Sequence, residues 1–354
     1  MLAADSKVGC VPPAGPSPTD AASAWKQIID PVEPFLEAVS RRLARQVEAF
    51  DPATKDYADY ALNGHGKHLR PALVALSASA LGGANDDHVT VAVIIESVHL
   101  ATLIHDDVMD EAEIRRGRLT LAANWGNDVA VLFGDCLFAH ALKLAAGFPT
   151  PEVCRAVAGA TQTVCSGEIH QTQHRGNLRL TFDQYFKMIE MKTGELFALS
   201  CDLSAYLCGA PAGLRQALRQ FGLALGTAYQ VYDDCVDLFG TEAVAGKSLG
   251  TDLATGKLTL PVLLVRDHAD AADRERLFQL LEARETGVLR QLAPLLAKYG
   301  TLAASMETIQ QYLAKARRSI EVLEPSEGRS GLLDLCDFLG RQTATLRAVP
   351  GTAA

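Results

Sequence analysis

Two short acidic runs carry the clearest chemical signal in this sequence. They read Asp106-Asp107-Val108-Met109-Asp110 and Asp233-Asp234-Cys235-Val236-Asp237, and each follows an apolar stretch. If each run lies on a helix, residues four apart share a face, so the first and last aspartates of a run point together. Like charges at that spacing repel each other, and the C-terminal part of a helix disfavours negative charge. Two such clusters of carboxylate oxygens indicate sites for a hard cation such as Mg²⁺, which completes its coordination with water and substrate phosphate.

Basic residues recur near the acidic runs, where a site for a diphosphate would need them. Lys and Arg form charge-assisted hydrogen bonds with phosphates, and Arg adds a two-pronged fork. Taken one by one, each of these cations is more often a surface residue, and a single acidic run is more often a solvated face. The combination of two acidic runs with several cations favours a functional site. The candidate cations are Lys67, Arg70, Arg115, Arg116, Lys192, Lys247 and Lys257.

The composition excludes some classes of protein. The 354 residues are 48% hydrophobic and 21% charged, which is ample for a large core. A net charge of −9 argues against a nucleic-acid binder that works by charge alone. The eight cysteines form no C-x-x-C pair, so free thiols in a reducing cytosol are favoured over a zinc site or a disulfide framework. We therefore expect a cytoplasmic protein.

No membrane-spanning segment is expected. The most apolar stretch, from Val89 to Ile104, is interrupted by Glu96 and His99, and no run approaches the roughly 20 apolar residues of a span. The N-terminal residues lack the basic start and the continuous apolar run of a signal peptide.

The elements that must position the acidic runs are predicted to be helices almost throughout. Alternation of period two is scarce, whereas Ala, Leu and Val stretches with polar residues at every third or fourth position recur. The fold class is therefore all-α, with a flexible tail over residues 1–22 and one domain over residues 23–354. Helices are predicted at 23–49, 54–62, 70–81, 88–112, 119–146, 150–174, 181–208, 212–239, 257–267, 271–283, 286–299, 301–322 and 329–347.

From about residue 60 to residue 265 the chain resembles the trans-isoprenyl diphosphate synthases, also called polyprenyl synthetases. Both acidic runs belong to an ordered series of motifs, which makes chance agreement untenable. The resemblance implies an all-α bundle around a deep central cavity. The matching motifs are Gly66-Lys67-x-x-Arg70-Pro71, Glu96-x-x-His99, Leu103-Ile104-His105-Asp106-Asp107-x-x-Asp110, Arg115-Arg116-Gly117, Gly134-Asp135, Gly167-Glu168-x-x-Gln171, Lys192-Thr193, Tyr229-Gln230-x-x-Asp233-Asp234-x-x-Asp237, and Gly246-Lys247-x-x-Gly250-x-Asp252 with Lys257.

The resemblance implies a prenyltransferase that extends an allylic diphosphate with isopentenyl diphosphate. The allylic diphosphate is expected between the two acidic helices with about three Mg²⁺ ions per active site, which stabilise charge as diphosphate leaves. The double bond of isopentenyl diphosphate then attacks the allylic cation, and loss of a proton completes one extension. A dry, apolar cavity must keep water away from the cation.

The resemblance also assigns roles to single residues. Asp106 and Asp110 are expected to hold two metal ions and Asp233 the third, with Asp107, Asp234 and Asp237 supporting them through water or hydrogen bonds. Arg115, Lys192 and Lys257 are expected to contact the allylic diphosphate, with Lys247 nearby. Lys67, Arg70, His99 and Arg116 are expected to hold isopentenyl diphosphate. Thr193 and Gln230 are expected at the reacting centre, and His105 is expected to be structural.

The residues before the first acidic run bear on the length of the product. Ala101 and Thr102 precede Asp106 by about one helical turn, and a bulky aromatic there would close the cavity early. Neither is bulky, and the acidic run has no insertion of the kind found in bacterial farnesyl diphosphate synthases. The segment looks like octaprenyl and related long-chain synthases, which predicts a long-chain product for a quinone side chain. Phe133 and Phe138 are candidates for the floor, and a geranylgeranyl or farnesyl diphosphate synthase is the alternative.

Two other classes fit less well. A class I terpene cyclase needs neither a second complete D-D-x-x-D run nor the segment from Gly66 to Pro71. An inactive regulatory subunit typically loses acidic motifs, whereas this chain keeps both. The family resemblance also implies a homodimer, and a long product implies a transient contact with a membrane for its release.

Overall fold

The fold was examined in a computed structural model that describes residues 18–63, 66, 68–241, 249–283 and 287–346. Lys67 and Lys247, both expected site residues, lie outside this part of the chain, as do residues 1–17. The described residues are helical apart from one two-stranded hairpin and the connections. The elements are α1 (Pro18–Ile29), η1 (Asp30–Val32), α2 (Glu33–Gln46), η2 (Val47–Ala49), η3 (Pro52–Thr54), α3 (Lys55–Leu62), α4 (Leu69–Ser79), α5 (Asp86–Met109), β1 (Ile114–Arg115), β2 (Arg118–Leu119), α6 (Leu121–Trp125), α7 (Asn127–Ala146), α8 (Glu152–Gln173), α9 (Phe182–Ile189), η4 (Glu190–Gly194), α10 (Glu195–Leu207), α11 (Ala212–Phe239), α13 (Thr251–Ala254), α14 (Leu260–His268), α15 (Ala271–Ala283), α16 (Val288–Lys298), α17 (Thr301–Ser319) and α18 (Glu327–Ala344).

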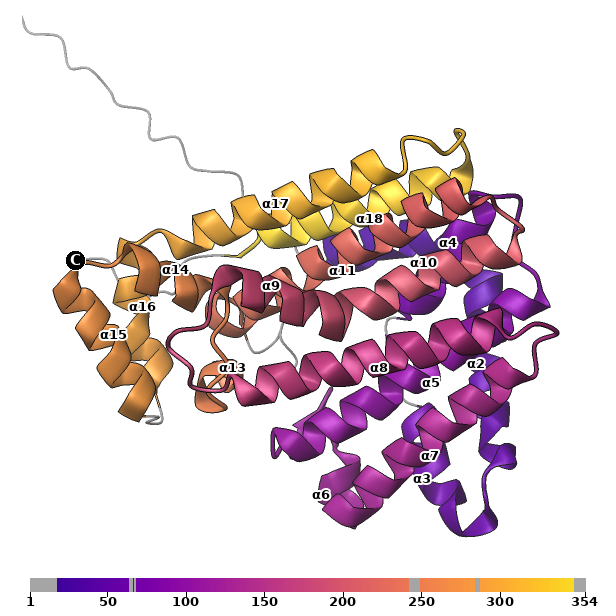
Figure 1. Ribbon diagram of the computed structural model, residues 1–354, viewed down its shortest axis with the longest axis horizontal. Helices are drawn as coiled ribbons and strands as arrows, with labels where there is room; N and C mark the ends of the chain where they lie inside the picture. The colour runs from indigo at the N-terminus through magenta and orange to yellow at the C-terminus, as the bar shows by residue number, and fades with distance from the viewer. Residues whose placement is uncertain (1–17, 64–65, 67, 242–248, 284–286, 347–354) are drawn as a thin grey trace, which may run out of the picture.

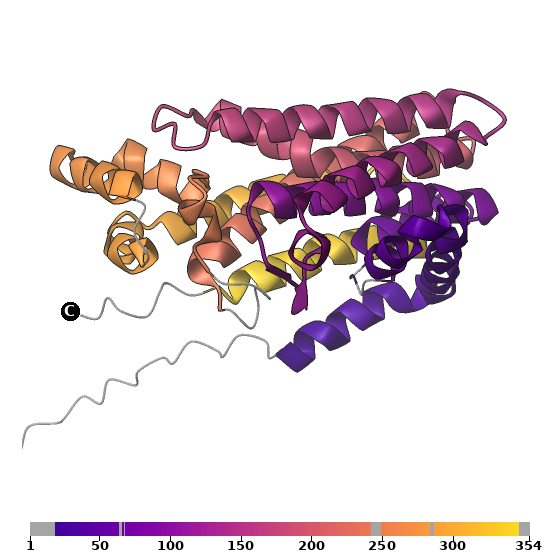
Figure 2. The ribbon, with the colours of Figure 1, turned by 90° about the horizontal axis from the view of Figure 1, so that it is seen from below.

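The long helices lie side by side in one bundle (Figures 1 and 2). Helix α11 packs between α10 and α17, and α5 packs against α7, α4 and α10. Helix α8 runs along α10 and α7 and crosses the middle of the view in Figure 1. The two helices that end in the acidic runs, α5 and α11, are thus joined through α10, which contacts both.

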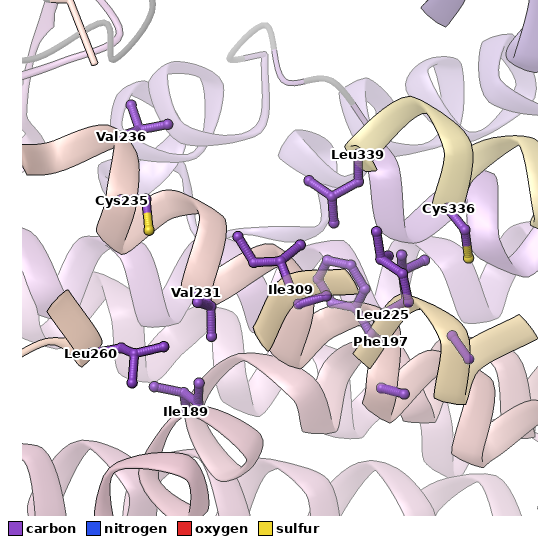
Figure 3. Close-up of a cluster of buried hydrophobic side chains, with 14 of the residues drawn as sticks. Ile189, Phe197, Leu225, Val231, Cys235, Val236, Leu260, Ile309, Cys336 and Leu339 are labelled. Atoms are coloured by element: carbon purple, nitrogen blue, oxygen red, sulfur yellow. The ribbon is translucent and has the colours of Figure 1, made fainter. Parts of the chain in front are cut away.

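Two apolar clusters hold this arrangement. One is built around α11 and includes Phe197, Leu225 and Ile309, which converge from α10, α11 and α17 (Figure 3). The other surrounds α5, where Val91, Ala92 and their neighbours are fully buried. Burying apolar surface at about 25 cal/mol per Å² makes such clusters the main favourable contribution to folding. They fix the ends of α5 and α11 relative to each other.

Local sequence sets where several helices begin. Helix α5 starts with a capping box, because Asn85 accepts from the backbone N–H of His88 and its own N–H donates to Nδ1 of His88. Helix α9 starts in the same way with Thr181 and Gln184. Helix α5 ends in the first acidic run, and α9 ends at Ile189, directly before η4.

Most of the expected helices are present, and two have the predicted bounds, α11 and α15. The expected helix over 23–49 is divided, since Pro31 and Pro34 each start a new helical segment. Helix α1 begins at Pro18, inside the expected tail of residues 1–22. The expected helix over 181–208 contains a π-helical turn at Glu190–Gly194.

The single helix expected over 119–146 was wrong. Ile114–Leu119 form a hairpin, in which Ile114 pairs with Leu119, and a short α6 follows it. Gly126 then separates α6 from α7 with a φ of +89°, a conformation that favours glycine. The apolar pattern correctly predicted helices in this segment, but it did not show that Gly126 divides them into α6 and α7.

The expectation that no segment could span a membrane by length and hydropathy also needs correction. Two described helices, Asp86–Met109 and Asn127–Ala146, are long and apolar enough by these two criteria. Glu96 and His99 are outweighed by the Val, Ile and Leu residues around them, so the mean hydropathy of the α5 window is 1.5. This window is 67% buried inside the molecule, as expected for a core helix, whereas the α7 window is 39% buried.

Candidate active site

The first acidic run lies in the last turn of α5, where two lysines from distant segments meet it. Lys257 Nζ lies 2.6 Å from Asp110 Oδ2, and Lys192 Nζ lies 3.3 Å from Asp106 Oδ2. Burial pushes the pKa of Asp110 upward, but the positive charges of Lys257 and Lys192 outweigh it and hold this pKa below its usual value. The structure therefore brings together two carboxylates and two cations that the sequence predicted for one site.

Lys192 is held by a second carboxylate that the sequence analysis quoted in a motif but gave no role. Its ammonium lies 2.7 Å from Glu168 Oε1 and donates to Gln171 Oε1 at 3.1 Å, both on α8. Burial opposes the charged form of Lys192, yet Asp106 and Glu168 raise its pKa above the usual value. Lys192 therefore remains a cation inside the site.

The π-helical turn explains how Lys192 and Thr193 reach the site together. The turn widens the helix between α9 and α10; π-turns occur mostly as single-turn insertions inside α-helices and are frequent at functional sites. In a regular α-helix, adjacent side chains point about 100° apart. Here Lys192 faces Asp106 while Thr193 faces α11, so one short turn serves both acidic helices.

Asp107 and Arg115 form a pair of their own. Asp107 is only 5% exposed, and Arg115 Nε donates to its Oδ1 at 2.7 Å. Burial raises the pKa of Asp107, and Arg115 partly offsets this effect. Asp107 therefore joins the helix end to the hairpin, and its support of a metal ion remains a prediction. The contact of Arg115 with an allylic diphosphate remains a prediction.

The second acidic run contains a relay of hydrogen bonds across three helical segments. Thr193 Oγ1 donates to Gln230 Oε1 at 2.7 Å, and Gln230 Nε2 donates to Asp234 Oδ1 at 2.8 Å. The hydroxyl of Tyr185, on α9, donates to the other carboxylate oxygen of Asp234 at 2.5 Å. Burial and the nearby charge of Asp252 raise the pKa of Asp234 well above its usual value. The relay fixes the orientation of Gln230 and Thr193.

Tyr185 was missed by the sequence analysis. It lies in an amphipathic helix whose apolar face is buried, so its pattern indicates only a core aromatic residue. Its hydroxyl is what distinguishes it, because a buried hydroxyl needs a partner, but the sequence does not show which one. Burial and the Asp234 carboxylate raise the pKa of Tyr185, so it donates as a neutral phenol.

The other two aspartates of the second run differ from each other. Asp237 is fully buried and accepts from the backbone N–H groups of Thr251 and Asp252, both at 3.2 Å, at the start of α13. It therefore anchors the loop that leads to Lys257. Asp233 is half-buried on the same helix.

Arg70, His99 and Arg116 form a second cluster beside α5. Burial and the charges of Arg70 and Arg116 hold the pKa of His99 well below its usual range, so the ring is neutral. A Cβ added to Gly66 would lie 3.0 Å from Arg116 Nη1, so the glycine leaves room for that guanidinium. Burial lowers the pKa of Arg70, and the carboxylate of Glu96, only 7% exposed, offsets this effect in part.

This second cluster has donors to spare. Arg70 Nε and His68 Nδ1 are buried and have no hydrogen-bond partner among the residues that the structure describes. Arg70 also lies over the ring of Phe197, with 5.0 Å from its guanidinium carbon to the ring centroid. A buried guanidinium with an unpaired donor fits an anionic ligand, since unsatisfied buried donors are otherwise unfavourable.

A cavity of about 270 Å³ opens beside the first acidic run, between α5, α7 and α8. Its polar end is formed by Asp106 and Glu168, and the rest of its wall is mainly apolar. Thr102 is in the wall, whereas Ala101 is fully buried in the core and is not among the lining residues. Of the two aromatic candidates for a floor, Phe138 lines the cavity and Phe133 does not. The lining residues are Thr102, His105, Asp106, Val108, Met109, Val131, Phe138, Val164, Cys165, Glu168 and Ile169.

His105 joins α5 to α7. Its Nε2 lies 3.0 Å from the carbonyl oxygen of Val131, and a Cβ on Gly134 would lie 2.2 Å from the same nitrogen. Only glycine therefore permits this close approach, which supports a structural role for His105 and explains the Gly134-Asp135 motif.

The donor chemistry of the site fits divalent metal ions. The carboxylates at the ends of α5 and α11 are hard oxygen ligands, and those at the end of α5 are accompanied by cations that suit a phosphate. In the described part of the chain, no three acidic, His or Cys side chains already converge as a complete metal cage.

Comparisons with known proteins agree with this geometry. Residues 51–296 match the model of the family described as Polyprenyl synthetase. The chain is similar to octaprenyl diphosphate synthase of Haemophilus influenzae, with 30% identity over 86% of this chain and 92% of that protein. It is also similar to a short chain isoprenyl diphosphate synthase of Methanothermobacter thermautotrophicus, with 30% identity over 88% of this chain and 98% of that protein.

A solved structure extends the likeness to the fold. The crystal structure of a polyprenyl synthase from Caulobacter crescentus, complexed with calcium and isoprenyl diphosphate, is similar with a TM-score of 0.82. The two sequences are 29% identical, and the match covers 92% of this chain and 99% of that one.

Proposed function

This chain belongs to the polyprenyl synthetase family, and we propose that it extends an allylic diphosphate with isopentenyl diphosphate into a long-chain product. Like the family, it is a prenyltransferase that makes a polyprenyl diphosphate and works with divalent metal ions. The observation that carries the proposal is the acidic end of α5, where Asp106 and Asp110 lie beside Lys192 and Lys257. Thr193, next to Lys192, donates to Gln230 on α11, the helix that carries the second acidic run. The second cluster of cations, around Arg70, supplies the second diphosphate site that an elongating enzyme needs.

The allylic diphosphate binds at the first acidic run in this proposal. Asp106, Asp110 and Asp233 fit as ligands for about three Mg²⁺ ions, which would neutralise charge on the departing diphosphate. Lys192 and Lys257 release their carboxylates and donate to the diphosphate oxygens, with Arg115 and Lys247 nearby. Lys192 and Lys257 already lie beside the first acidic run, where negative charge develops as the C–O bond breaks.

Isopentenyl diphosphate binds at the second cluster of cations. Arg70 and Arg116, with Lys67, bind its diphosphate, while the neutral His99 donates or accepts without adding charge. The allylic C–O bond breaks with its electron pair going to diphosphate, and the double bond of isopentenyl diphosphate attacks the cation. The oriented dipoles of Thr193 and Gln230 steady the cation, and the departing diphosphate takes the proton that is lost.

The growing hydrocarbon enters the cavity beside α5. Its wall beyond Asp106 is mainly apolar, which favours the prenyl chain and excludes water from the cation. Thr102 is small and lies in this wall, so the first turn below the metal ligands does not close the cavity. This supports a long-chain product of the kind used for a quinone side chain.

A shorter product, such as geranylgeranyl or farnesyl diphosphate, is the second candidate. It is favoured by one observation, the ring of Phe138 in the wall of the same cavity. The similarity to a short chain synthase at the same level of identity as to an octaprenyl synthase supports keeping it.

A homodimer is part of the proposal. Leu132 is 65% exposed and Ile169 57% exposed, on the adjacent helices α7 and α8. Ile169 and Val131 also line the cavity, so its apolar wall continues onto the surface. A second copy packed on this face would bury these side chains and close the cavity laterally. We further propose a cytoplasmic location, with a transient membrane contact for release of a long product.

The test is incubation with labelled isopentenyl diphosphate, Mg²⁺ and each primer from dimethylallyl to geranylgeranyl diphosphate, with products resolved by length. A ladder that ends beyond geranylgeranyl diphosphate is expected. Products that stop at farnesyl or geranylgeranyl diphosphate would favour the second candidate. No extension from any primer would contradict the proposed reaction.

A further inference from the structure

We propose that Arg175 is a further binding residue of this active site and that it donates to the diphosphate of the allylic substrate. The inference rests on the proposed function and adds a residue to it. Arg175 lies between α8 and α9, outside every motif that the sequence analysis singled out. It was therefore not expected at the site.

The first observation is its contact with a carboxylate that is expected to bind metal. Arg175 Nη2 donates to Asp110 Oδ1 at 2.7 Å, and Nη1 donates to the carbonyl oxygen of Met109 at 3.2 Å. Lys257 holds the other oxygen, Oδ2, at 2.6 Å. Both oxygens of Asp110 are thus engaged by cations, one from each of two loops.

The second observation is that these two loops are fastened to each other. The backbone N–H of Gly176 donates to the carbonyl oxygen of Gly256 at 2.7 Å, one residue after Arg175 and one residue before Lys257. Gly176 has a φ of +70° and Gly256 a φ of +75°, conformations that glycine adopts without strain. The loops therefore present Arg175 and Lys257 as a pair, directed at one carboxylate.

The third observation is an unused donor. Arg175 Nε is buried and has no hydrogen-bond partner within the described ranges. A guanidinium carries five N–H donors in a planar fork that matches phosphate oxygens. Nη2 donates to Asp110 and Nη1 donates to the carbonyl oxygen of Met109, so the N–H of Nε remains for an anion that the described part of the chain does not supply.

These observations fix what must happen when Asp110 becomes a ligand. A metal ion held by Asp110 would compete for the carboxylate oxygens that Arg175 and Lys257 now occupy. Arg175 would then lie beside a metal ion of like charge and need another anion. The allylic diphosphate supplies anionic oxygens at this place, and the unpaired donor is ready to bind one of them.

A purely structural role is the alternative. Arginine near the end of a helix can bind its last carbonyl groups, as Arg175 does with Met109. A capping residue of that kind stabilises α5 but does not respond to substrate. A measurement of substrate binding therefore distinguishes a diphosphate-binding residue from a helix cap, whereas a measurement of stability does not.

The experiment compares Arg175→Gln with Arg179→Gln in the full-length protein. Arg179 lies in the same connection and is exposed, so the control removes the same charge from the same loop. The probe is geranyl thiolodiphosphate, an allylic analogue that does not react, titrated by calorimetry in the presence of Mg²⁺. We expect the Kd of Arg175→Gln to rise about tenfold, the effect of losing roughly one charge-assisted hydrogen bond, and that of the control to stay unchanged.

A kinetic measurement supplies the second readout. Arg175→Gln should raise the KM for the allylic diphosphate by a similar factor and leave the KM for isopentenyl diphosphate unchanged. Arg175→Lys, which keeps the charge but loses the fork, should recover part of the binding. Thermal unfolding of each variant checks that it is folded.

The outcomes are distinct. If Arg175→Gln melts at a lower temperature but binds the analogue like the wild type, the residue is only a helix cap and the inference is overturned. The same holds if both KM values rise together. If the wild-type protein itself neither binds the analogue nor extends a primer, the proposed function fails, which is a different result from failure of Arg175 alone.

Discussion

At the scale of residues, every carboxylate of the first acidic run is already matched with a cation. Lys192 pairs with Asp106, Arg115 with Asp107, and Lys257 with Asp110. These positive charges offset the repulsion between Asp106 and Asp110, which lie four residues apart on one helix. The sequence predicted that these residues belong to one site, because their motifs resemble those of a known family, but it did not predict which of them pair. It could not predict Glu168 and Tyr185 as partners, because their neighbours come from other helices.

The hydrogen-bond relay gives the first prediction. Tyr185→Phe removes the donor to Asp234 and leaves a buried carboxylate oxygen unsatisfied, at about 1–3 kcal/mol. Because Asp234 holds Gln230, which holds Thr193, the orientation at the reacting centre should be lost. We expect kcat to fall about tenfold with little change in either KM.

Tyr206→Phe is the matched control for this prediction. The hydroxyl of Tyr206 contacts only the exposed Thr150 in the described part of the chain, at 2.8 Å, so its loss should leave kcat unchanged. Equal kcat values for Tyr185→Phe and the wild type would show that the relay does not position the reacting groups.

The neutral His99 gives a prediction on pH. Its native pKa lies well below 6.5, whereas the unfolded chain takes up a proton near pH 6.5. Below this pH the unfolded state therefore binds more protons than the native state, so the free energy of unfolding falls as the pH falls. The slope from this one group is at most about 1.4 kcal/mol per pH unit.

Denaturant unfolding of His99→Gln and of the wild type, measured from about pH 8 to about pH 5, tests this contribution of His99 to the pH dependence of stability. His99→Gln should flatten the loss of stability on the acid side, and His268→Gln, at an exposed position, should not. An unchanged slope in His99→Gln would mean that His99 takes up its proton at the same pH in the native state as in the unfolded chain.

At the scale of elements, the apolar periodicity predicted the helices well because most of them bury one face in a common core. Helix α11 illustrates this success. The failures occur where one residue or a local contact decides the outcome, as at Gly126, at the π-helical turn and at the hairpin of β1 and β2. These features depend on backbone angles and on neighbours in space, which a period in the sequence does not contain.

The cavity between α5, α7 and α8 gives the prediction at this scale. Thr102 and Phe138 line it from α5 and α7, so their volumes should set how far the product grows. Thr102→Phe should shorten the longest product, and Phe138→Ala should lengthen it. Both changes should leave the rate of the first condensation within about threefold, because Thr102 donates to the backbone carbonyl of His99 rather than to a side chain that binds diphosphate, and Phe138 has no polar group.

Phe133→Ala is the control for these two variants, because Phe133 lies on the same helix as Phe138 but is buried outside the cavity. Its product should keep the wild-type length, although the protein should lose about 3–5 kcal/mol of stability. If all three variants give the wild-type product, the chain does not grow in this cavity.

At the scale of the whole molecule, one bundle holds two acidic helix ends and two clusters of cations, and it leaves an apolar face exposed on α7 and α8. The sequence predicted the class of fold, and its resemblance predicted the dimer. It could not indicate which face is exposed, because α7 is as apolar as the core helix α5 and differs only in how much of it the rest of the chain covers.

The exposed face gives the prediction at this scale. Leu132→Glu places a charge at the centre of the proposed interface and should convert a dimer into a monomer, as measured by light scattering after size-exclusion chromatography. Val322→Glu, at a similarly exposed apolar residue outside this face, should leave the dimer intact. A dimer that persists in Leu132→Glu would place the interface elsewhere.

The central claim is that the two acidic helices act together in one metal-dependent prenyl transfer. The most direct measurement is Mg²⁺-dependent incorporation of labelled isopentenyl diphosphate by Asp106→Asn and by Asp233→Asn, with Asp87→Asn at an exposed position of α5 as the control. Each of the first two variants should lose at least about a hundredfold in kcat while remaining folded, since each removes a charge that stabilises the transition state. The control should match the wild type. Full activity in either Asp106→Asn or Asp233→Asn would contradict the account.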